Sequence, residues 1–194
     1  MLLNEKLAGK QIILASQSPR RHELLTLMGI PFEVIVKPTN ESFNPDLKRE
    51  AVALHIAKNK AAAFAPFQDA NTYIITADTI VCLDDDILNK PADNAEALMM
   101  LKKIQGRKHT VITAVTINTA GKQVAFFVSS DVYFKPLDEE QIAYYVNTYK
   151  PFDKAGAYGI QEWIGIVGLE RIDGSYTNVM GLPTTQLYDA LLRF

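Results

Sequence analysis

The sequence predicts an α/β fold with a mixed β-sheet, built as one domain or as two lobes that share a cleft. Strand-type and helix-type segments alternate along its 194 residues, which is typical of parallel strands joined by helices. Hairpin turns interrupt this alternation, and hairpins join antiparallel strands. The composition, 48% hydrophobic and 22% charged, is that of a globular chain able to bury a core.

The strands are predicted from runs of apolar and β-branched residues bounded by turn-forming residues. The most strand-like run is 72–83, in which Asp78 is the one charged residue. The three aspartates at 84–86 predict a solvated hairpin turn. The expected strands are 11–15, 32–36, 72–83, 87–88, 109–118, 123–134 and 164–172.

The helices are predicted from start and stop signals around amphipathic segments. Ser18 before Pro19 fits an N-cap followed by proline at the first helical position. The aspartates at positions 93 and 138 open sequences typical of a capping box, and Pro66 ends the longest helix. The expected helices are 19–28, 47–65, 94–105, 139–149 and 183–194, and the main loops are 38–45, 151–161 and 174–181.

Charge and cysteine content argue against several classes of protein. The net charge of −2 and the pI near 5.9 argue against general nucleic-acid binding, which needs a basic face. Cys82 is the one cysteine, so no disulfide framework or cysteine zinc site is expected. The sequence has no signal-peptide pattern and no apolar run of membrane-spanning length. We therefore expect a soluble, cytoplasmic protein with neither a nucleic-acid nor a membrane partner.

Two arginines stand where helix electrostatics disfavour them. Arg20 and Arg21 fall in the first turn of the helix expected after Pro19, where the helix dipole is positive. Each cation there is disfavoured by roughly 0.3–1 kcal/mol. An anion held by backbone N–H groups and both guanidinium groups would reverse this cost. We favour a phosphate site that includes Ser16 and Ser18; the alternative is ordinary surface charge.

Asp78 is the sharpest candidate for chemistry. A buried carboxylate costs several kcal/mol unless it is paired or binds a metal. Strand ends are where α/β proteins place ligands. The alternative is an aspartate that caps a turn, with Thr79 as an ordinary strand residue.

Weaker candidates surround this pattern. Lys60 and Lys90 are candidates to face the same anion, and each alone also fits a lysine whose stem lies on apolar surface. Glu41 offers a second carboxylate for a divalent cation. The glycine-bearing stretch 153–161 allows close approach of backbone to a ligand, and Gln161 has the donor and acceptor that reading a base edge requires.

Taken in order, these motifs resemble the Maf family of nucleoside triphosphate pyrophosphatases. The stretch from Lys154 to Gln161 resembles the branch that acts on dTTP and UTP. The matching segments span nearly the whole chain and are residues 16–21, 23–25, 77–79, 90–91, 113–115, 154–161 and 181–183.

The resemblance implies a fold, a reaction and a cofactor. The fold would be a single domain over residues 1–194, with a mixed, twisted central sheet flanked by helices and two lobes around a cleft, similar to the inosine triphosphatases. The reaction would convert a nucleoside triphosphate and water into the monophosphate and pyrophosphate, with a divalent cation, Mg²⁺ or Mn²⁺.

The resemblance also assigns roles to residues. Asp78 would be the general base, and with Glu41 a metal ligand; which role dominates for Asp78 is left open. Asn40 departs from the family pattern, in which a second acid often stands beside Glu41. The remaining positions are Arg20, Thr79 and Gln161 for base selection, and Ser16, Ser18, Arg21, Lys60, Lys90 and Lys154 for phosphate.

Two other functions are weighed against this one. A phosphatase with Asp78 as covalent nucleophile is disfavoured, because Ile80 stands where a second aspartate would be needed. A nucleotide-binding regulator of cell division would bind the same nucleotides without turnover. The oligomeric state is left open, with a homodimer among the options.

Overall fold

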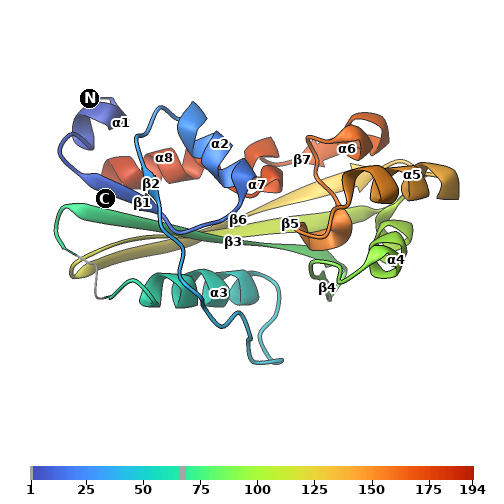
Figure 1. Ribbon diagram of the computed structural model, residues 1–194, viewed down its shortest axis with the longest axis horizontal. Helices are drawn as coiled ribbons and strands as arrows, with labels where there is room; N and C mark the ends of the chain where they lie inside the picture. Colours follow the sequence, from blue (N-terminus) through green and yellow to red (C-terminus); the bar gives the residue numbers. More distant parts are fainter. Residues whose placement is uncertain (1, 66–68) are drawn as a thin grey trace. The chain divides into compact units, whose positions relative to one another are not determined.

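The computed structural model describes residues 2–65 and 69–194 and contains a mixed sheet (Figure 1). The strand order is β2-β1-β3-β5-β6-β7, and β4 pairs with β3. β1 is parallel to β2 and β3, whereas the β3–β4 and β6–β7 pairs are antiparallel. The strands are β1 Gln11–Leu14, β2 Glu33–Val34, β3 Thr72–Leu83, β4 Asp86–Leu88, β5 Lys108–Thr119, β6 Lys122–Phe134 and β7 Leu169–Asp173.

Helices flank the sheet, as expected. The longest among the described residues is α3, which carries its buried side chains on one face. The helices are α1 Leu3–Lys6, α2 Pro19–Leu27, α3 Glu50–Ala62, α4 Asn94–Ile104, α5 Glu139–Tyr149, the 3₁₀ helix η2 Ala155–Ala157, α6 Trp163–Gly168, α7 Tyr176–Met180 and α8 Thr184–Arg193.

The chain divides into two compact units, each made of separate segments. Unit 1 comprises Met1–Asp78, Thr113–Val128 and Gly181–Phe194, and unit 2 comprises Thr79–Ile112 and Ser129–Met180. The strands β3, β5 and β6 contribute residues to both units. The expectation of one domain over the whole chain stays a prediction, as does the cleft between two lobes.

Unit 1 has a layered core. Figure 1 shows α3 on one face of its strands, with α2 and α8 on the other. Ile13 of β1, Ile74 of β3 and Phe64 after α3 pack together and are almost fully buried. A near-continuous buried run along β3 is what a strand covered on both faces requires.

Unit 2 is built around two amphipathic helices. α4 packs against α5, and the buried faces hold Met100, Leu101 and Ile104 from α4 with Ile142 and Val146 from α5. Among the described residues, none of the helices combines the length and apolar character needed to cross a membrane.

The predicted fold class and most predicted elements are confirmed. At α5, the Asp138 side chain accepts a hydrogen bond from the Gln141 backbone N–H at 2.7 Å, and the Gln141 side chain accepts one from the Asp138 N–H at 3.0 Å. At α2, Pro19 is the first helical residue, as expected. The helix expected over 47–65 is shorter, because Arg49 has a φ of 45° and helical geometry begins after it. Pro66 lies outside the described residues.

Two predictions of secondary structure were wrong. The strand expected over 164–172 is a helix, α6, followed by the strand β7. The loop expected over 174–181 contains the helix α7, where the Ser175 hydroxyl accepts a hydrogen bond from the Asn178 N–H at 3.3 Å. The β-branched residues at 164–167 favour a strand by propensity, and tertiary packing overrides that preference.

Gly165 shows how tightly α6 is packed. A Cβ at this position would lie 1.8 Å from the carbonyl oxygen of Ile160. Helix propensity alone favours alanine over glycine by about 1 kcal/mol, and a collision of this kind costs more. We expect Gly165→Ala to lower the free energy of unfolding by about 2 kcal/mol, measured by chemical denaturation.

The matched control is the next residue, Ile166, whose side chain is 78% exposed. Ile166→Ala should change the free energy of unfolding by less than about 0.5 kcal/mol. Stability of Gly165→Ala equal to or above that of the wild type would show that the close approach does not exist.

Candidate active site

The turn between β1 and α2 joins a strand to a helix start, as the sequence predicted, and the anion site expected there stays a prediction. Ser16 is buried, and its hydroxyl accepts a hydrogen bond from the Ser18 N–H at 3.2 Å. Ser18 occupies the N-cap position of α2, but its side chain makes no capping hydrogen bond. The Ser18 hydroxyl therefore caps no backbone N–H of this helix. Arg20 is half-buried in the first turn.

Arg21 has a structural role within unit 1. Its Nε donates to the carbonyl oxygen of Gly181 at 2.8 Å, and its Nη1 donates to the Ala77 carbonyl at 2.9 Å and to the Ser16 hydroxyl at 3.2 Å. Burial lowers the pKa of Arg21, and the carboxylate of Asp78 raises it in partial compensation. The contribution of Arg21 to phosphate binding stays a prediction.

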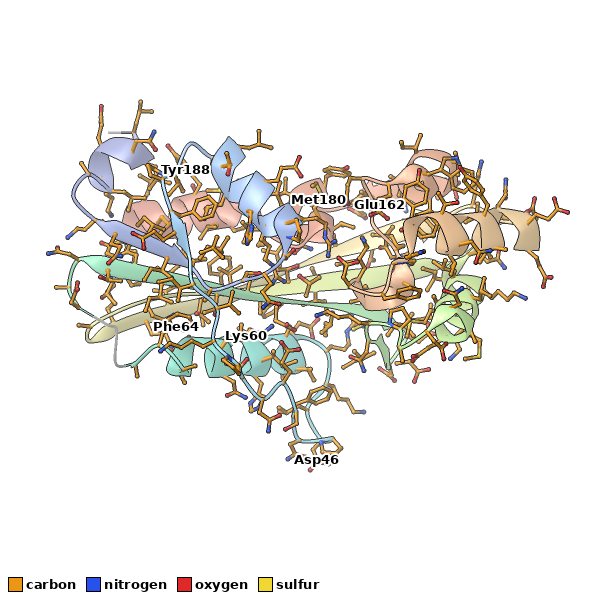
Figure 2. The ribbon with its side chains drawn as sticks, viewed as in Figure 1. Asp46, Lys60, Phe64, Glu162, Met180 and Tyr188 are labelled. Atoms are coloured by element: carbon orange, nitrogen blue, oxygen red, sulfur yellow. The ribbon has the colours of Figure 1, made fainter. Side chains whose placement is uncertain are left out.

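Asp78 forms an ion-pair cluster with residues from two other segments of unit 1. Lys60 of α3 (Figure 2) places its Nζ 2.7 Å from Asp78 Oδ1 and 2.9 Å from Glu41 Oε1. The side chains of Asp78 and Lys60 are 12% and 17% exposed, whereas Glu41 is half exposed. The cost of burying the Asp78 carboxylate is thus offset by Lys60. The sequence had predicted that this lysine faces a bound phosphate.

The carboxylates of Asp78 and Glu41 suit a divalent cation that also binds a phosphate. Both converge on one ammonium group, so they lie within reach of a common cation. Mg²⁺ is usually held by one or two carboxylates together with waters and substrate phosphates. Among residues 2–65 and 69–194, no group of three or more His, Cys, Asp or Glu side chains forms a metal cage. The donor set therefore fits a cation shared with a nucleotide better than a resident metal.

Unit 2 holds the other predicted site residues. Thr79 is half-buried on β3, directly after Asp78 in the chain, and Lys90 is exposed after β4. Lys154 is buried and bound within its own unit: its Nζ lies 2.7 Å from Asp153 Oδ1 and 3.1 Å from Glu162 Oε1. This lysine therefore neutralises carboxylates.

Gln161 has a side-chain oxygen without a partner. Its Oε1 is buried and accepts no hydrogen bond from any residue that the structure describes. Buried polar atoms are nearly always hydrogen-bonded to protein, water or a ligand, so this acceptor has capacity for a donor from a bound ligand. This observation supports the prediction that Gln161 reads a base edge.

Glycine in the stretch 153–161 is required by backbone geometry. Gly156 has a φ of 70°, and a Cβ there would lie 3.0 Å from the side chain of Val81. Its N–H donates to the carbonyl of Asn89 at 3.2 Å, which ties the stretch to the segment beside Lys90. The glycine thus serves close packing, and the approach of a ligand to this stretch stays a prediction.

Sequence reasoning missed two residues of this region, Tyr145 and Glu162. The Tyr145 hydroxyl donates to Glu162 Oε2 and accepts a hydrogen bond from the Gly159 N–H at 2.9 Å. In the sequence, Tyr145 is one of several apolar-face residues of α5, and Glu162 follows Gln161 without a motif of its own. Their contacts join segments far apart in the chain, so no local signal pointed to them.

The predicted site residues thus form two groups. Within unit 1, Asp78, Lys60 and Glu41 are in contact, and Ser16 contacts Arg21. Within unit 2, Lys154 contacts Glu162, the residue that follows Gln161. Unit 1 contains Ser16, Ser18, Arg20, Arg21, Glu41, Lys60 and Asp78, and unit 2 contains Thr79, Lys90, Lys154 and Gln161.

Comparison with known proteins gives matches along most of the chain. A family model described as "Maf-like protein" matches residues 11–194. The chain is 50% identical over 188 residues to a dTTP/UTP pyrophosphatase of Phocaeicola vulgatus, covering 96% of this chain and 97% of that protein. It is 47% identical over 191 residues to a dTTP/UTP pyrophosphatase of Parabacteroides distasonis, covering 98% and 99%.

A solved structure, the Staphylococcus aureus Ham1 protein, gives a weaker match. It is 14% identical, with a TM-score of 0.46, over 64% of this chain and 72% of its own. This overlap is too small to support a detailed comparison.

A buried histidine, His109, packs against the stretch 153–161. His109 Nε2 and the Tyr158 hydroxyl are hydrogen-bonded at 2.7 Å, and both rings pack edge-on against Phe134. Burial lowers the pKa of His109 from 6.5 to about 4, and nearby Asp131 raises it slightly. The imidazole is therefore neutral at physiological pH and serves structure.

This pKa predicts an acid-sensitive stability. Between pH 6.5 and about 4 the unfolded chain binds a proton at His109 that the folded chain does not, so stability falls as the pH drops through this window. The full loss is about 3 kcal/mol. We expect His109→Gln to flatten the dependence of the unfolding free energy on pH across this window, measured by urea denaturation.

His55→Gln is the control, because His55 is half-buried on α3 and bonds to Asn59 of the same helix. It should leave the slope as in the wild type. A slope that His109→Gln does not reduce would mean that this histidine titrates normally in the folded protein.

Proposed function

Because the chain belongs to the Maf family, we propose that it is a nucleoside triphosphate pyrophosphatase that hydrolyses dTTP and UTP to the monophosphate and pyrophosphate. Relatives that bear the name dTTP/UTP pyrophosphatase are 43–50% identical over nearly the whole chain. The observation that carries the proposal in the structure is the ion pair between the buried Asp78 and the half-buried Lys60, with Glu41 beside it. A modified pyrimidine nucleotide is a further substrate of the same class.

Asp78 is assigned the role of general base. A water oxygen attacks the α-phosphorus and forms a new P–O bond, while the bond from that phosphorus to the bridging oxygen of the β-phosphate breaks. The Asp78 carboxylate accepts the proton of the water, and pyrophosphate leaves with the electron pair. A positioned base typically contributes 10²–10⁴-fold in rate.

Lys60 is assigned to hold the carboxylate and to offset phosphate charge. Its ammonium group lies 2.7 Å from the Asp78 carboxylate and offsets the cost of burying that charge. As negative charge moves to the leaving group, cations at the site stabilise it. Arg20 and Lys90 are assigned the same task toward the phosphates, with Lys154 in a supporting role.

Asp78 and Glu41 are the residues that would hold Mg²⁺ or Mn²⁺. When bound, such a cation polarises phosphoryl oxygens and lowers the pKa of a bound water. The protein groups would still have to orient the water and the triphosphate.

Gln161 is assigned to recognise the base. Uracil and thymine present an N–H donor at N3 between two carbonyl oxygens, and cytosine presents an acceptor there. The unpaired Oε1 of Gln161 can accept from that N–H, while its amide donates to a neighbouring carbonyl. Such a pair of hydrogen bonds favours uracil and thymine over cytosine.

The first test identifies the products of the reaction and removes the general base, Asp78. Wild type should convert dTTP and UTP to monophosphate and pyrophosphate with Mg²⁺ or Mn²⁺. Asp78→Asn should lower kcat at least about 100-fold, because the amide cannot accept the proton. Asp86→Asn, at an exposed strand residue, is the control and should keep wild-type kcat.

Products identify the competing functions. Diphosphate with orthophosphate would overturn the proposal in favour of a phosphatase. Nucleotide binding without turnover by wild type would favour the regulator of cell division, and full activity in Asp78→Asn would remove Asp78 from the base assignment.

A second test concerns recognition of the pyrimidine base by Gln161. We expect Gln161→Glu to lower kcat/KM for UTP and dTTP about tenfold or more, because the amide donor is lost and a negative charge is added. The loss in kcat/KM should be smaller for CTP, so the preference for UTP and dTTP over CTP becomes smaller. Gln186→Glu on the exposed face of α8 makes the same chemical change away from the site. Unchanged relative rates across a nucleotide panel would exclude Gln161 from base selection.

A further inference from the structure

Gln161 lies within a tight turn that ends at Glu162. The Glu162 N–H donates to the carbonyl oxygen of Gly159 at 3.0 Å, so residues 159–162 form a β-turn with Gln161 as its third residue. α6 begins directly after this turn, where the Gly165 N–H donates to the Glu162 carbonyl at 2.9 Å. These two hydrogen bonds therefore fix the backbone on either side of Gln161.

A single hydroxyl group bonds to both ends of that turn. Tyr145 of α5 accepts a hydrogen bond from the Gly159 N–H at 2.9 Å and donates one to Glu162 Oε2. Its side chain is fully buried, and its ring stacks on Tyr149 with centroids 5.1 Å apart. Burial, and next the bond to Glu162, raise the pKa of the Tyr145 phenol, so the hydroxyl stays protonated as a donor.

The carboxylate of Glu162 is held over the turn from the other side as well. Lys154 Nζ lies 3.1 Å from Glu162 Oε1, which neutralises the half-buried acid. A Cβ at Gly159 would lie 2.8 Å from the carboxyl carbon of Glu162, so the carboxylate folds closely over the turn. Glu162, which Figure 2 labels, is the N-cap residue of α6. Glu162 thus joins α5, the turn and the stretch that holds Lys154.

We propose that Tyr145 and Glu162 are positioning residues that hold Gln161 in place for recognition of the uracil or thymine base. The inference rests on the proposed function, since it concerns the same site. Neither side chain is assigned a contact with the nucleotide: they act by fixing the backbone on both sides of Gln161. A hydrogen bond weakens steeply with poor geometry, so a looser turn weakens base recognition before it affects chemistry.

The test is Tyr145→Phe, which removes the hydroxyl and keeps the ring. We expect KM for UTP to rise about fivefold, the size of one lost hydrogen bond, with kcat within about twofold of wild type. KM for CTP should stay unchanged, so the preference for UTP over CTP falls by the same factor.

Tyr149→Phe is the matched control. It makes the same chemical change on the same helix, in the ring that stacks on Tyr145. It should leave the preference for UTP over CTP at the wild-type value. A uniform loss of kcat for all nucleotides in Tyr145→Phe would indicate general damage to the fold and would overturn the proposal.

A double variant tests whether Tyr145 acts through Gln161. In a Gln161→Ala background, Tyr145→Phe should cause no further change in the preference, because the group being positioned is gone. Equal effects of Tyr145→Phe in both backgrounds would overturn the proposal. Glu162→Gln is a second variant that keeps the size of the side chain, and it serves as the test if Tyr145→Phe does not fold. It should likewise lower the preference for UTP over CTP.

Binding separates this inference from the proposed function. The same variants are titrated calorimetrically with the α,β-imido analogues of UTP and CTP, in which the scissile bridge is replaced. If wild type prefers the UTP analogue without hydrolysing UTP, the proposed function fails and the positioning role is still measured. If wild type hydrolyses UTP and both variants keep the full preference, the positioning role fails and the proposed function stands. A wild type without preference between the analogues overturns the positioning role.

Discussion

The guanidinium group of Arg21 holds together three segments of unit 1 that are distant in sequence. It bonds to the turn after β1, to the middle of β3 through the Ala77 carbonyl, and to Gly181 before α8. A buried cation is costly without partners, and here backbone carbonyls and the nearby Asp78 carboxylate supply them. This explains an arginine at a helix start that the dipole disfavours: its donors point away from the helix and into the unit. Because Asp78 is the residue after Ala77, this contact lies directly beside the candidate base.

Two lysines among the predicted site residues, one in each unit, each contact a pair of acids. Lys60 contacts Asp78 and Glu41, and Lys154 contacts Asp153 and Glu162. An ammonium group has three N–H donors, so among the described residues these contacts leave one donor on each lysine for a phosphate oxygen. Under the proposed function, that donor would bind a phosphate oxygen while the carboxylates stay in contact with the lysine. Within each unit the acids balance the charge of their lysine and restrict where it points.

Local patterns predicted most of the fold. Proline at the first turn of α2 and the capping box of α5 depend on neighbours in the chain, and both are present. α6 and α7 were missed because their helical form is decided by contacts such as that between Gly165 and Ile160. The sequence indicated that a buried Asp78 carboxylate must be paired or bind a metal. Only the structure identified Lys60 as its partner, with Glu41 on the same ammonium group. The role of Tyr145 could not be predicted, because the sequence shows only a tyrosine on the apolar face of a helix and not the hydrogen-bond partners of its hydroxyl.

The interleaved construction of the two units has a consequence for the order of folding. The chain passes from one unit to the other four times, after residues 78, 112, 128 and 180. During synthesis from the N-terminus, unit 2 therefore has all its segments once residue 180 has emerged, while unit 1 still lacks 181–194. Until then Arg21 has no Gly181 carbonyl to bind, and Leu187 and Leu191 of α8 have not yet filled the core. Such long sequence separations slow folding, so the unit that carries Asp78 is the last to be completed.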